Sequence, residues 1–208
     1  LGYENFLTLS ALAFNPQTFT AWIADIWAER LYELRTNMSV KKEIHLSSQP
    51  VDMAIDTTGE RLFTLLMNEN SVHQLSFDGY LHEFILLPTT VSRHCRLAYD
   101  DITSSVWISN YEENLVYRYK LNDPLDSLIT FIGVQDPRDI VPDPLEGGCW
   151  VATKAGITII DHDGSISVYK NSLDIKDISL NSVNGDCYYV GKNLNTSQWE
   201  TGRLIKQE

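Results

Sequence analysis

The sequence predicts an all-β protein, and within that class a β-propeller of about five four-stranded blades. The first observation is a recurring motif in which an aromatic residue precedes small or β-branched residues. The motif begins at Trp22, Phe63, Trp107, Trp150 and Tyr188, at steps of 41, 44, 43 and 38 residues. The second observation is that a short apolar stretch and a turn precede each motif, and an alternating stretch follows it. Modules of four short strands that repeat at about 40 residues are typical of β-propellers.

The module from Pro50 to Phe84 shows this pattern most completely. Its four predicted strands are Met53–Asp56, Arg61–Leu66, Ser71–Phe77 and Tyr80–Leu86. Turn-forming residues separate these strands, as expected for short antiparallel strands. The Asp78-Gly79 pair predicts a two-residue hairpin turn in which both residues take a positive φ.

The modules together account for the whole chain as one propeller domain. Their approximate ranges are 10–46, 50–86, 95–132, 137–169 and 176–208. The last module stops after its third strand, and the segment Tyr3–Leu9 has the pattern of the missing fourth strand. We expect this N-terminal strand to complete the last blade and close the ring, which would remove two exposed sheet edges. An excerpt from a longer array of six or seven blades stays open as the alternative.

One segment carries a competing local signal. Trp22–Leu34 has apolar residues at helix-like spacing and is rich in helix-forming residues. Read alone it predicts a helix. The repeat places strands at Trp22 and Leu31, so we expect strands here.

Composition excludes several classes of function. The formal net charge of −12 argues against nucleic-acid binding, which depends on Lys and Arg neutralising phosphates. No run of 18 apolar residues is present, so no membrane span is expected. The three cysteines, Cys95, Cys149 and Cys187, make no disulfide framework, and we expect buried free thiols. Composition does not determine the localisation. An extracellular location and a place in a larger assembly are both compatible with it.

The modules resemble NHL-type repeats, a propeller family. The residues that match the pattern of that family in the second module are Pro50, Ile55-Asp56, Gly59, Phe63, Asn70, Val72 and Asp78-Gly79. Trp22-Ile23-Ala24-Asp25 and Arg30-Leu31 match in the first module, and Pro137, Trp150-Val151-Ala152 and Asp163-Gly164 in the fourth. Sugar-lactone hydrolases and streptogramin lyases are propellers with similar blades. The resemblance implies a binding platform by analogy of fold.

Charged residues gather where the innermost strand of each blade begins. These candidate binding residues are Asp52, Arg96, Arg138, Asp139 and Asp177. The three aspartates could converge on a divalent cation, as a lactonase-type site requires. However, Arg96, Arg138 and Lys176 adjoin them, so we expect charge pairs around a solvated funnel, with no cofactor. His-based zinc or acid–base motifs and a Gly-x-Ser-x-Gly elbow are absent from the sequence.

Aromatic residues outside the core pattern lie in the loops that join second and third strands. Trp27, Tyr111 and Trp199 (in the expected long loop Lys192–Thr201) could grip a protein segment or stack on sugar rings. We therefore expect a non-enzymatic binding or scaffold propeller that presents this loop face to a protein partner, for instance within a larger structural or attachment assembly. The alternatives are a carbohydrate-binding propeller and a metal-dependent lactonase- or lyase-like enzyme.

Overall fold

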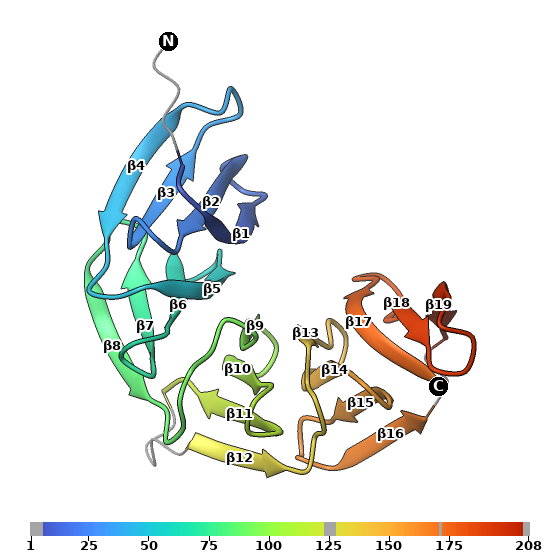
Figure 1. The fold of residues 1–208 in the computed structure, drawn as a ribbon. Helices are drawn as coiled ribbons and strands as arrows, with labels where there is room; N and C mark the ends of the chain where they lie inside the picture. The colour runs from blue at the N-terminus through green and yellow to red at the C-terminus, as the bar shows by residue number, and fades with distance from the viewer. Residues whose placement is uncertain (1–5, 123–127, 171, 206–208) are drawn as a thin grey trace. The chain divides into compact units, whose positions relative to one another are not determined.

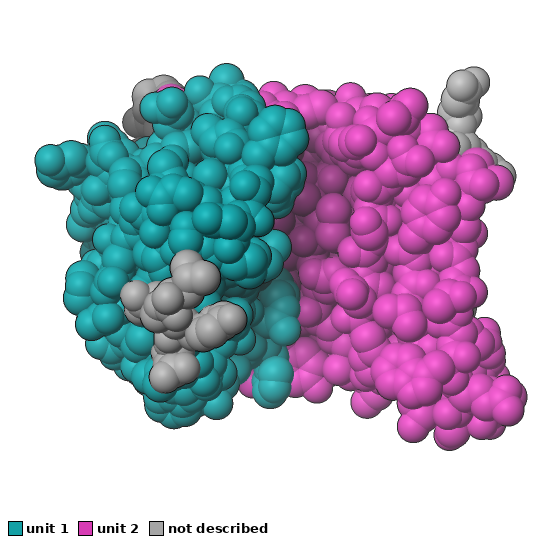
Figure 2. All heavy atoms as spheres, turned by 90° about the horizontal axis from the view of Figure 1, so that it is seen from above, with its two compact units in different colours: residues 1–97 teal, residues 98–208 magenta. Residues whose placement is uncertain are grey.

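The computed structural model describes residues 6–122, 128–170 and 172–205 and contains 19 strands over these residues (Figure 1). The strands form antiparallel sheets, four of them four-stranded and one three-stranded as described. The all-β prediction is therefore confirmed. No helix in the described part of the chain is long and apolar enough to cross a membrane. The chain divides into two compact units, 1–97 and 98–208, which Figure 2 colours separately.

Unit 1 holds the first and second sheets, in the strand orders β1-β2-β3-β4 and β5-β6-β7-β8. The strands of the first sheet are β1 (Leu9–Asn15), β2 (Thr20–Asp25), β3 (Arg30–Leu34) and β4 (Val40–His45). Those of the second are β5 (Pro50–Asp56), β6 (Arg61–Leu66), β7 (Ser71–Ser76) and β8 (Leu81–Leu86). Each strand thus pairs with its neighbours in sequence.

Unit 2 holds the third, fourth and fifth sheets, apart from the first two residues of β9. The strands of the third sheet are β9 (Arg96–Asp100), β10 (Ser105–Asn110), β11 (Leu115–Lys120) and β12 (Leu128–Ile132). Those of the fourth are β13 (Asp139–Pro142), β14 (Cys149–Thr153), β15 (Gly156–Ile160) and β16 (Ile166–Lys170). The fifth sheet contains β17 (Leu173–Leu180), β18 (Cys187–Asn193) and β19 (Trp199–Leu204).

Packing between sheets explains why the helix-like segment Trp22–Leu34 forms two strands. In β2, Trp22 and Ala24 face the second sheet, whereas Ile23 faces the opposite side together with Tyr32 of β3. Both faces of these strands are therefore buried, and the apolar residues do not show simple alternation with polar ones. The repeat, rather than the local spacing, predicted this segment correctly.

The turn after the first strand of each sheet is fixed by one side chain. An Asn or Asp at or next to the end of the strand accepts hydrogen bonds from backbone N–H groups two or three residues further on. These residues are Asn15, Asp56, Asp100, Asp143 and Asn181. Such Asx turns reverse the chain within a few residues, which allows the second strand to pair at once with the first.

The core consists of the aromatic side of one sheet packed against the next sheet in sequence. In unit 1, Trp22 and Leu31 pack against Met53 and Leu62. In unit 2, the third sheet contributes Trp107, which packs in one cluster with residues of the fourth sheet such as Ile140, Val151 and Ile160. Trp150 of the fourth sheet packs in turn with Ile175, Ile178 and Cys187 of the fifth. Three of the module aromatics predicted from the repeat, Trp22, Trp107 and Trp150, thus belong to these buried clusters.

The hairpin at Asp78-Gly79 differs from its predicted geometry. Only Gly79 has a positive φ, of 89°, and its N–H donates to the carbonyl of Ser76. Ser76 in turn donates to the carbonyl of Tyr80, and the register shifts between Gln74 and Leu75. This is the arrangement of a type I turn followed by a bulge at a left-handed glycine. The prediction of a turn was right, and that of two positive φ angles was wrong.

The N-terminal segment is not the predicted strand where the structure describes it. Phe6, Leu7 and Thr8 are not in a strand, and Leu9 already begins β1 of the first sheet. The Phe6 ring packs edge-on against Tyr32, and the N–H groups of Leu7 and Thr8 bind the Asp25 carboxylate. Residues 3–5 of the proposed closing strand Tyr3–Leu9 lie outside the described residues. The described part thus belongs to the first sheet because its backbone is bound there.

The three cysteines are buried and free, as expected. Burial raises the pKa of the Cys149 thiol well above its usual range and that of Cys187 to about 12. These thiols therefore stay protonated and act as small apolar side chains in the core.

The bulge at Gly79 gives the first prediction. Gly79 and Gly133 have nearly equal φ angles of 89° and 87°, but a Cβ on Gly79 would lie 3.2 Å from Ile44, whereas nothing lies within 4 Å of one on Gly133. Gly133→Ala should lower the free energy of unfolding by about 1–2 kcal/mol, the cost of a left-handed conformation. Gly79→Ala should cost about 1 kcal/mol more, because the buried Ile44 must shift. Urea denaturation measures both, and equal losses would show that the contact with Ile44 contributes nothing.

Candidate functional site

Antiparallel pairing brings two kinds of segment to one end of each sheet. The start of the first strand lies opposite the end of the second, as Leu9 pairs with Asp25 and Asp139 with Ala152. The turn between second and third strands is therefore at the same end, and Ile26 N–H donates to the Thr8 carbonyl there. We call this the loop end of a sheet. The sequence-predicted site residues lie at the loop ends or next to them.

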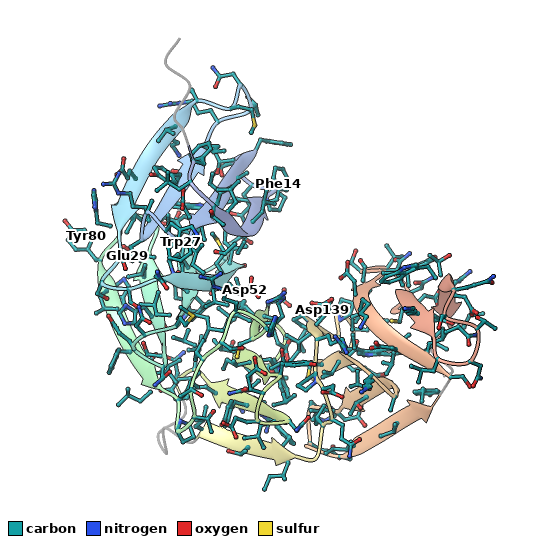
Figure 3. All side chains as sticks on the ribbon, in the orientation of Figure 1. Phe14, Trp27, Glu29, Asp52, Tyr80 and Asp139 are labelled. Carbon is teal, nitrogen blue, oxygen red and sulfur yellow. The ribbon has the colours of Figure 1, made fainter. Side chains whose placement is uncertain are left out.

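Unit 1 has a hollow of about 190 Å³ at its loop ends. The residues that line it are Thr8, Leu9, Ser10, Ile26, Val51, Arg93 and Arg96. Trp27, which is labelled in Figure 3, adjoins it. Its side chain is 52% exposed, and the guanidinium carbon of Arg93 lies 4.9 Å from the centroid of its ring. The hollow thus combines two cations with an exposed aromatic ring.

A buried carboxylate holds Trp27 in place. Asp25 is fully buried, and its Oδ1 accepts the backbone N–H groups of Trp27 at 3.2 Å and Ala28 at 3.1 Å. The same carboxylate accepts the N–H groups of Leu7 at 2.6 Å and Thr8 at 3.2 Å. Four backbone donors satisfy the charge of Asp25, so the turn and the preceding segment are fixed together.

The two arginines of the hollow bind no carboxylate among the residues described in unit 1. Arg96 Nη1 donates to the carbonyls of Arg93 at 3.0 Å and Cys95 at 2.8 Å, which fixes the segment between them. The guanidinium of Arg93 stacks on Trp27 instead. Guanidinium groups bind carboxylates strongly and in fixed geometry. The hollow is therefore suited to an anionic group from outside this set of residues.

Asp52 and Asp139 hold neighbouring strands together. Asp52 accepts the N–H of Met53 with Oδ1 at 2.9 Å and that of Leu97, in β9, with Oδ2 at 2.8 Å. Asp139 accepts the N–H of Ile140 at 2.9 Å and that of Ile178, in β17, at 3.0 Å. The direct hydrogen-bond partners of these aspartates are thus backbone donors, and the predicted neutralisation by an adjacent arginine is seen only as the effect of the Arg96 charge on Asp52.

Burial affects the protonation of both aspartates. It raises the pKa of Asp52 to about 6, although the N–H groups of Leu97 and Met53 and the charge of Arg96 act in the opposite direction. The pKa of Asp139 is raised to about 7, first by burial and then by a hydrogen bond with the Asp177 side chain. A carboxyl–carboxyl hydrogen bond requires a proton between the two groups, so this contact favours the protonated form of Asp139.

Arg138, the second arginine among the sequence-predicted site residues, lies in unit 2 and has different neighbours from those of Arg96. The guanidinium carbon of Arg138 lies 5.3 Å from the ring centroid of Tyr111, so the structure brings these two predicted residues together. Arg138 Nε also lies 3.0 Å from Asp174 Oδ1, and Lys176 Nζ lies 2.5 Å from Asp174 Oδ2. The charge of Arg138 is thus already paired within the protein, unlike that of Arg93.

Trp199 does not lie in a long loop. β18 extends to Asn193 and β19 begins at Trp199, so the turn between them comprises only residues 194–198. Asn193 ends β18 with another Asx turn, since its side chain accepts the N–H groups of Asn195 and Thr196. Trp199 is 64% exposed on β19 and pairs across the strands with Lys192. The loop prediction failed because the strands continue further than the repeat indicated.

Sequence reasoning missed three residues that build these sites: Arg93, Asp25 and Asp174. In the sequence, Asp25 is recognised only as a residue of the repeat. Asp174 lies before the expected start of the first strand of the last module. The spacing of Arg93 and Arg96, three residues apart just before β9, was the available signal for the hollow. Among the described residues, no group of three or more His, Cys, Asp or Glu side chains is placed to hold a metal ion.

Comparison with known proteins supports the fold class. No family model matches the sequence, and no curated protein matches it. The structure is similar to catalytically inactive virginiamycin B lyase from Staphylococcus aureus solved with quinupristin, with a TM-score of 0.74 and 16% identity over 97% of this chain and 71% of that one. It is also similar to Kuenenia stuttgartiensis hydrazine synthase, with a TM-score of 0.74 and 11% identity over 99% of this chain and 66% of that one. A third similar structure is U3-55K, with a TM-score of 0.72 and 14% identity over 95% of this chain and 64% of that one. These neighbours are propeller-like proteins and support a β-propeller fold. At such identities the likeness concerns the fold alone.

The raised pKa of Asp52 predicts a specific pH dependence of stability. Its pKa is about 6 in the folded protein against an ordinary value of 3.8 for an aspartate, so the folded state binds the proton more tightly than the unfolded state. The contribution of Asp52 to stability therefore falls as the pH rises from about 4 to about 6, and it no longer changes at higher pH. Relative to Asp52→Asn, the wild type should lose ~1–3 kcal/mol of unfolding free energy over this range.

Asp78→Asn is the matched control for this measurement. Asp78 is exposed, and its hydrogen bond and charge interaction with Lys42 lower its pKa, so its effect has the opposite sign. The wild type should gain stability relative to Asp78→Asn as the pH rises through the acid range. Denaturation curves at several pH values compare the three proteins. Parallel pH profiles for the wild type and Asp52→Asn would contradict the assignment.

Proposed function

We propose that the chain is a non-enzymatic binding propeller whose loop ends engage a protein partner. In this proposal the five sheets are five blades built from NHL-like repeats. The observation that carries the proposal is the hollow of unit 1, which Arg93 and Arg96 line and Trp27 adjoins, and whose arginines hydrogen-bond no carboxylate among the described residues of that unit. Trp and Arg are the residues most enriched at the centres of protein interfaces.

The charge of the hollow indicates which kind of group the partner contributes. The protein has a formal net charge of −12, so a site with two arginines that hydrogen-bond no carboxylate in the described part of unit 1 stands out from its surroundings. A carboxylate, from an Asp or Glu side chain or from a chain terminus, would form bidentate hydrogen bonds with a guanidinium there. The exposed Trp27 ring would cover an apolar neighbour of that carboxylate. The proposed ligand is therefore an acidic peptide segment with an apolar residue beside the acid.

The carbohydrate alternative has weaker support at this site. One face of Trp27 already carries Arg93 at 4.9 Å, which leaves the ring less free to stack on a sugar. The enzyme alternative rests on the similarity to a lyase, which concerns fold, and on Asp52, Asp139 and Asp177. Two of these aspartates bind backbone N–H groups of neighbouring strands, and Asp139 and Asp177 bind each other. This arrangement favours a structural role for them.

Selection from a displayed peptide library tests the proposed function. The wild-type protein should enrich peptides that contain Asp or Glu next to an apolar residue. Synthetic versions of these peptides should bind at least ~10-fold more weakly to Trp27→Ala and to Arg93→Gln, a loss of about 1.4 kcal/mol. Fluorescence anisotropy measures the affinities, and replacing the peptide acid by its amide should have a comparable effect.

Two control variants change similar residues of unit 1 outside the hollow. Arg35→Gln removes an exposed guanidinium that donates to Ser39 and Val40, and Phe19→Ala removes an aromatic ring that is 65% exposed. Both should bind the peptides as the wild type does. Enrichment of neutral or basic peptides, or affinities unchanged by Arg93→Gln, would contradict the proposal. Binding on a glycan array that Trp27→Ala abolishes would support the carbohydrate alternative instead.

A further inference from the structure

One face of the fifth sheet is open and hollowed. Six side chains alternate to the same side of its three strands: Asp177, Ser179, Tyr188, Val190, Thr201 and Arg203. They line a depression of about 540 Å³ together with their neighbours. The opposite face of the same sheet is covered by the fourth sheet, through Ile175, Ile178 and Cys187. The fifth sheet therefore has one packed face and one unpacked face.

The open face repeats the residue positions of the packed interfaces. Tyr188 occupies the position of Trp22, Trp107 and Trp150, which are no more than 2% exposed because the next sheet covers them. Tyr188 is 45% exposed. Arg203 lies over its ring at 5.9 Å, as Arg118 lies over Trp107 at 5.3 Å. The face thus carries the apolar centre and the flanking arginine of an interface that is buried elsewhere in unit 2.

A polar feature of the packed interfaces is also repeated. Asp177 lies one residue before the apolar residue Ile178 in β17. Asp139 lies in the same way one residue before Ile140 in β13. The Asp139 carboxylate reaches across to the N–H of Ile178 in the next sheet. Asp52 reaches in the same way to the N–H of Leu97. The Asp177 side chain has Asp139 as its partner instead. It is therefore placed where the other two aspartates bind a following first strand.

The first sheet presents the complementary half of such an interface. Leu12 and Phe14 alternate to one side of β1, at the positions that Met53 and Ile55 occupy in β5. Met53 is buried, and Ile55 is partly buried, in the interface with the first sheet. Leu12 is 68% exposed and Phe14, labelled in Figure 3, is 52% exposed. The strand β1 therefore has an exposed apolar side of the kind that covers a module aromatic elsewhere in the protein.

From these two faces we infer that the protein associates head to tail with a second copy of itself. The face of Tyr188 in one copy packs against the face of Leu12 and Phe14 in another, as sheet packs on sheet within each unit. The occupant is a second copy because this chain itself carries both halves of the repeated interface. The two halves differ, so the contact is heterologous, and each copy keeps one free half for a further copy.

Two physical effects oppose each other in this association. Covering Tyr188, Leu12 and Phe14 removes large apolar side chains from water, at roughly 25 cal/mol per Å² of apolar surface. The charge of −12 on each copy causes repulsion, which salt screens over a Debye length of about 8 Å at 0.15 M. The association should therefore strengthen as salt is added, in contrast to a contact made by opposite charges.

Complementation between two variants tests the inference. Tyr188→Glu destroys one half of the interface and leaves the other intact, and Leu12→Glu does the reverse. Each variant alone should sediment as a monomer, whereas the wild type should show larger species that increase with concentration. An equimolar mixture of the two variants should form a dimer that grows no further, because only one pair of intact faces remains. Analytical ultracentrifugation with one variant fluorescently labelled measures this.

The controls separate association from unfolding. Val183→Glu changes an apolar residue that is 84% exposed in the turn between β17 and β18, outside the open face, and should associate as the wild type does. Circular dichroism spectra should be the same for all four proteins. A wild type that stays monomeric up to roughly 0.5 mM, where even a weak dimer would form, overturns the inference. So does a mixture of the two variants that remains monomeric while both are folded.

Discussion

The structure depends on one repeated contact, the burial of a module aromatic between two sheets. A four-stranded sheet is apolar on both faces here and cannot cover either face by itself, so each module needs a neighbour. Trp22, Trp107 and Trp150 are at most 2% exposed, and truncating such a side chain costs about 3–5 kcal/mol. Total stabilities are only about 5–15 kcal/mol, so a single such contact is a large part of the whole.

This contact also determines where polar groups can be placed. In unit 2 the packing of the fourth sheet on the fifth brings the start of β13 next to β17, and in unit 1 the start of β5 lies next to Leu97. Asp52 and Asp139 use this proximity to bind the N–H groups of Leu97 and Ile178. Burial there raises the pKa of both carboxyl groups, which shows that the hydrogen bonds only partly offset the loss of hydration. The aspartates that were candidate ligands are thus parts of the scaffold.

The two aromatic–arginine pairs show how the same chemistry takes different roles. Arg93 on Trp27 and Arg138 on Tyr111 have similar geometry, at 4.9 Å and 5.3 Å. Asp174 binds Arg138 and also Lys176, so the charge of that site is satisfied internally. In unit 1, Arg96 contacts backbone carbonyls and acts on Asp52 through its charge, and Arg93 contacts a ring; neither hydrogen-bonds a carboxylate in the described part of that unit. One carboxylate distinguishes a structural cluster from a site suited to an anionic ligand.

The sequence by itself determined the order of the strands from β1 onward and the buried tryptophans of the core, because alternation and turn chemistry are local and repeat along the chain. The Arg61–Leu66 and Leu81–Leu86 strands and the buried tryptophans needed nothing else. Tertiary structure decided the placement of Leu7 and Thr8, whose N–H groups bind Asp25, and the start of β19 at Trp199, which pairs with Lys192 of β18. It also decided the partners of the charged residues. Trp27 and Arg93 are far apart in sequence, and only the packing of the first and second sheets brings that ring and that guanidinium together.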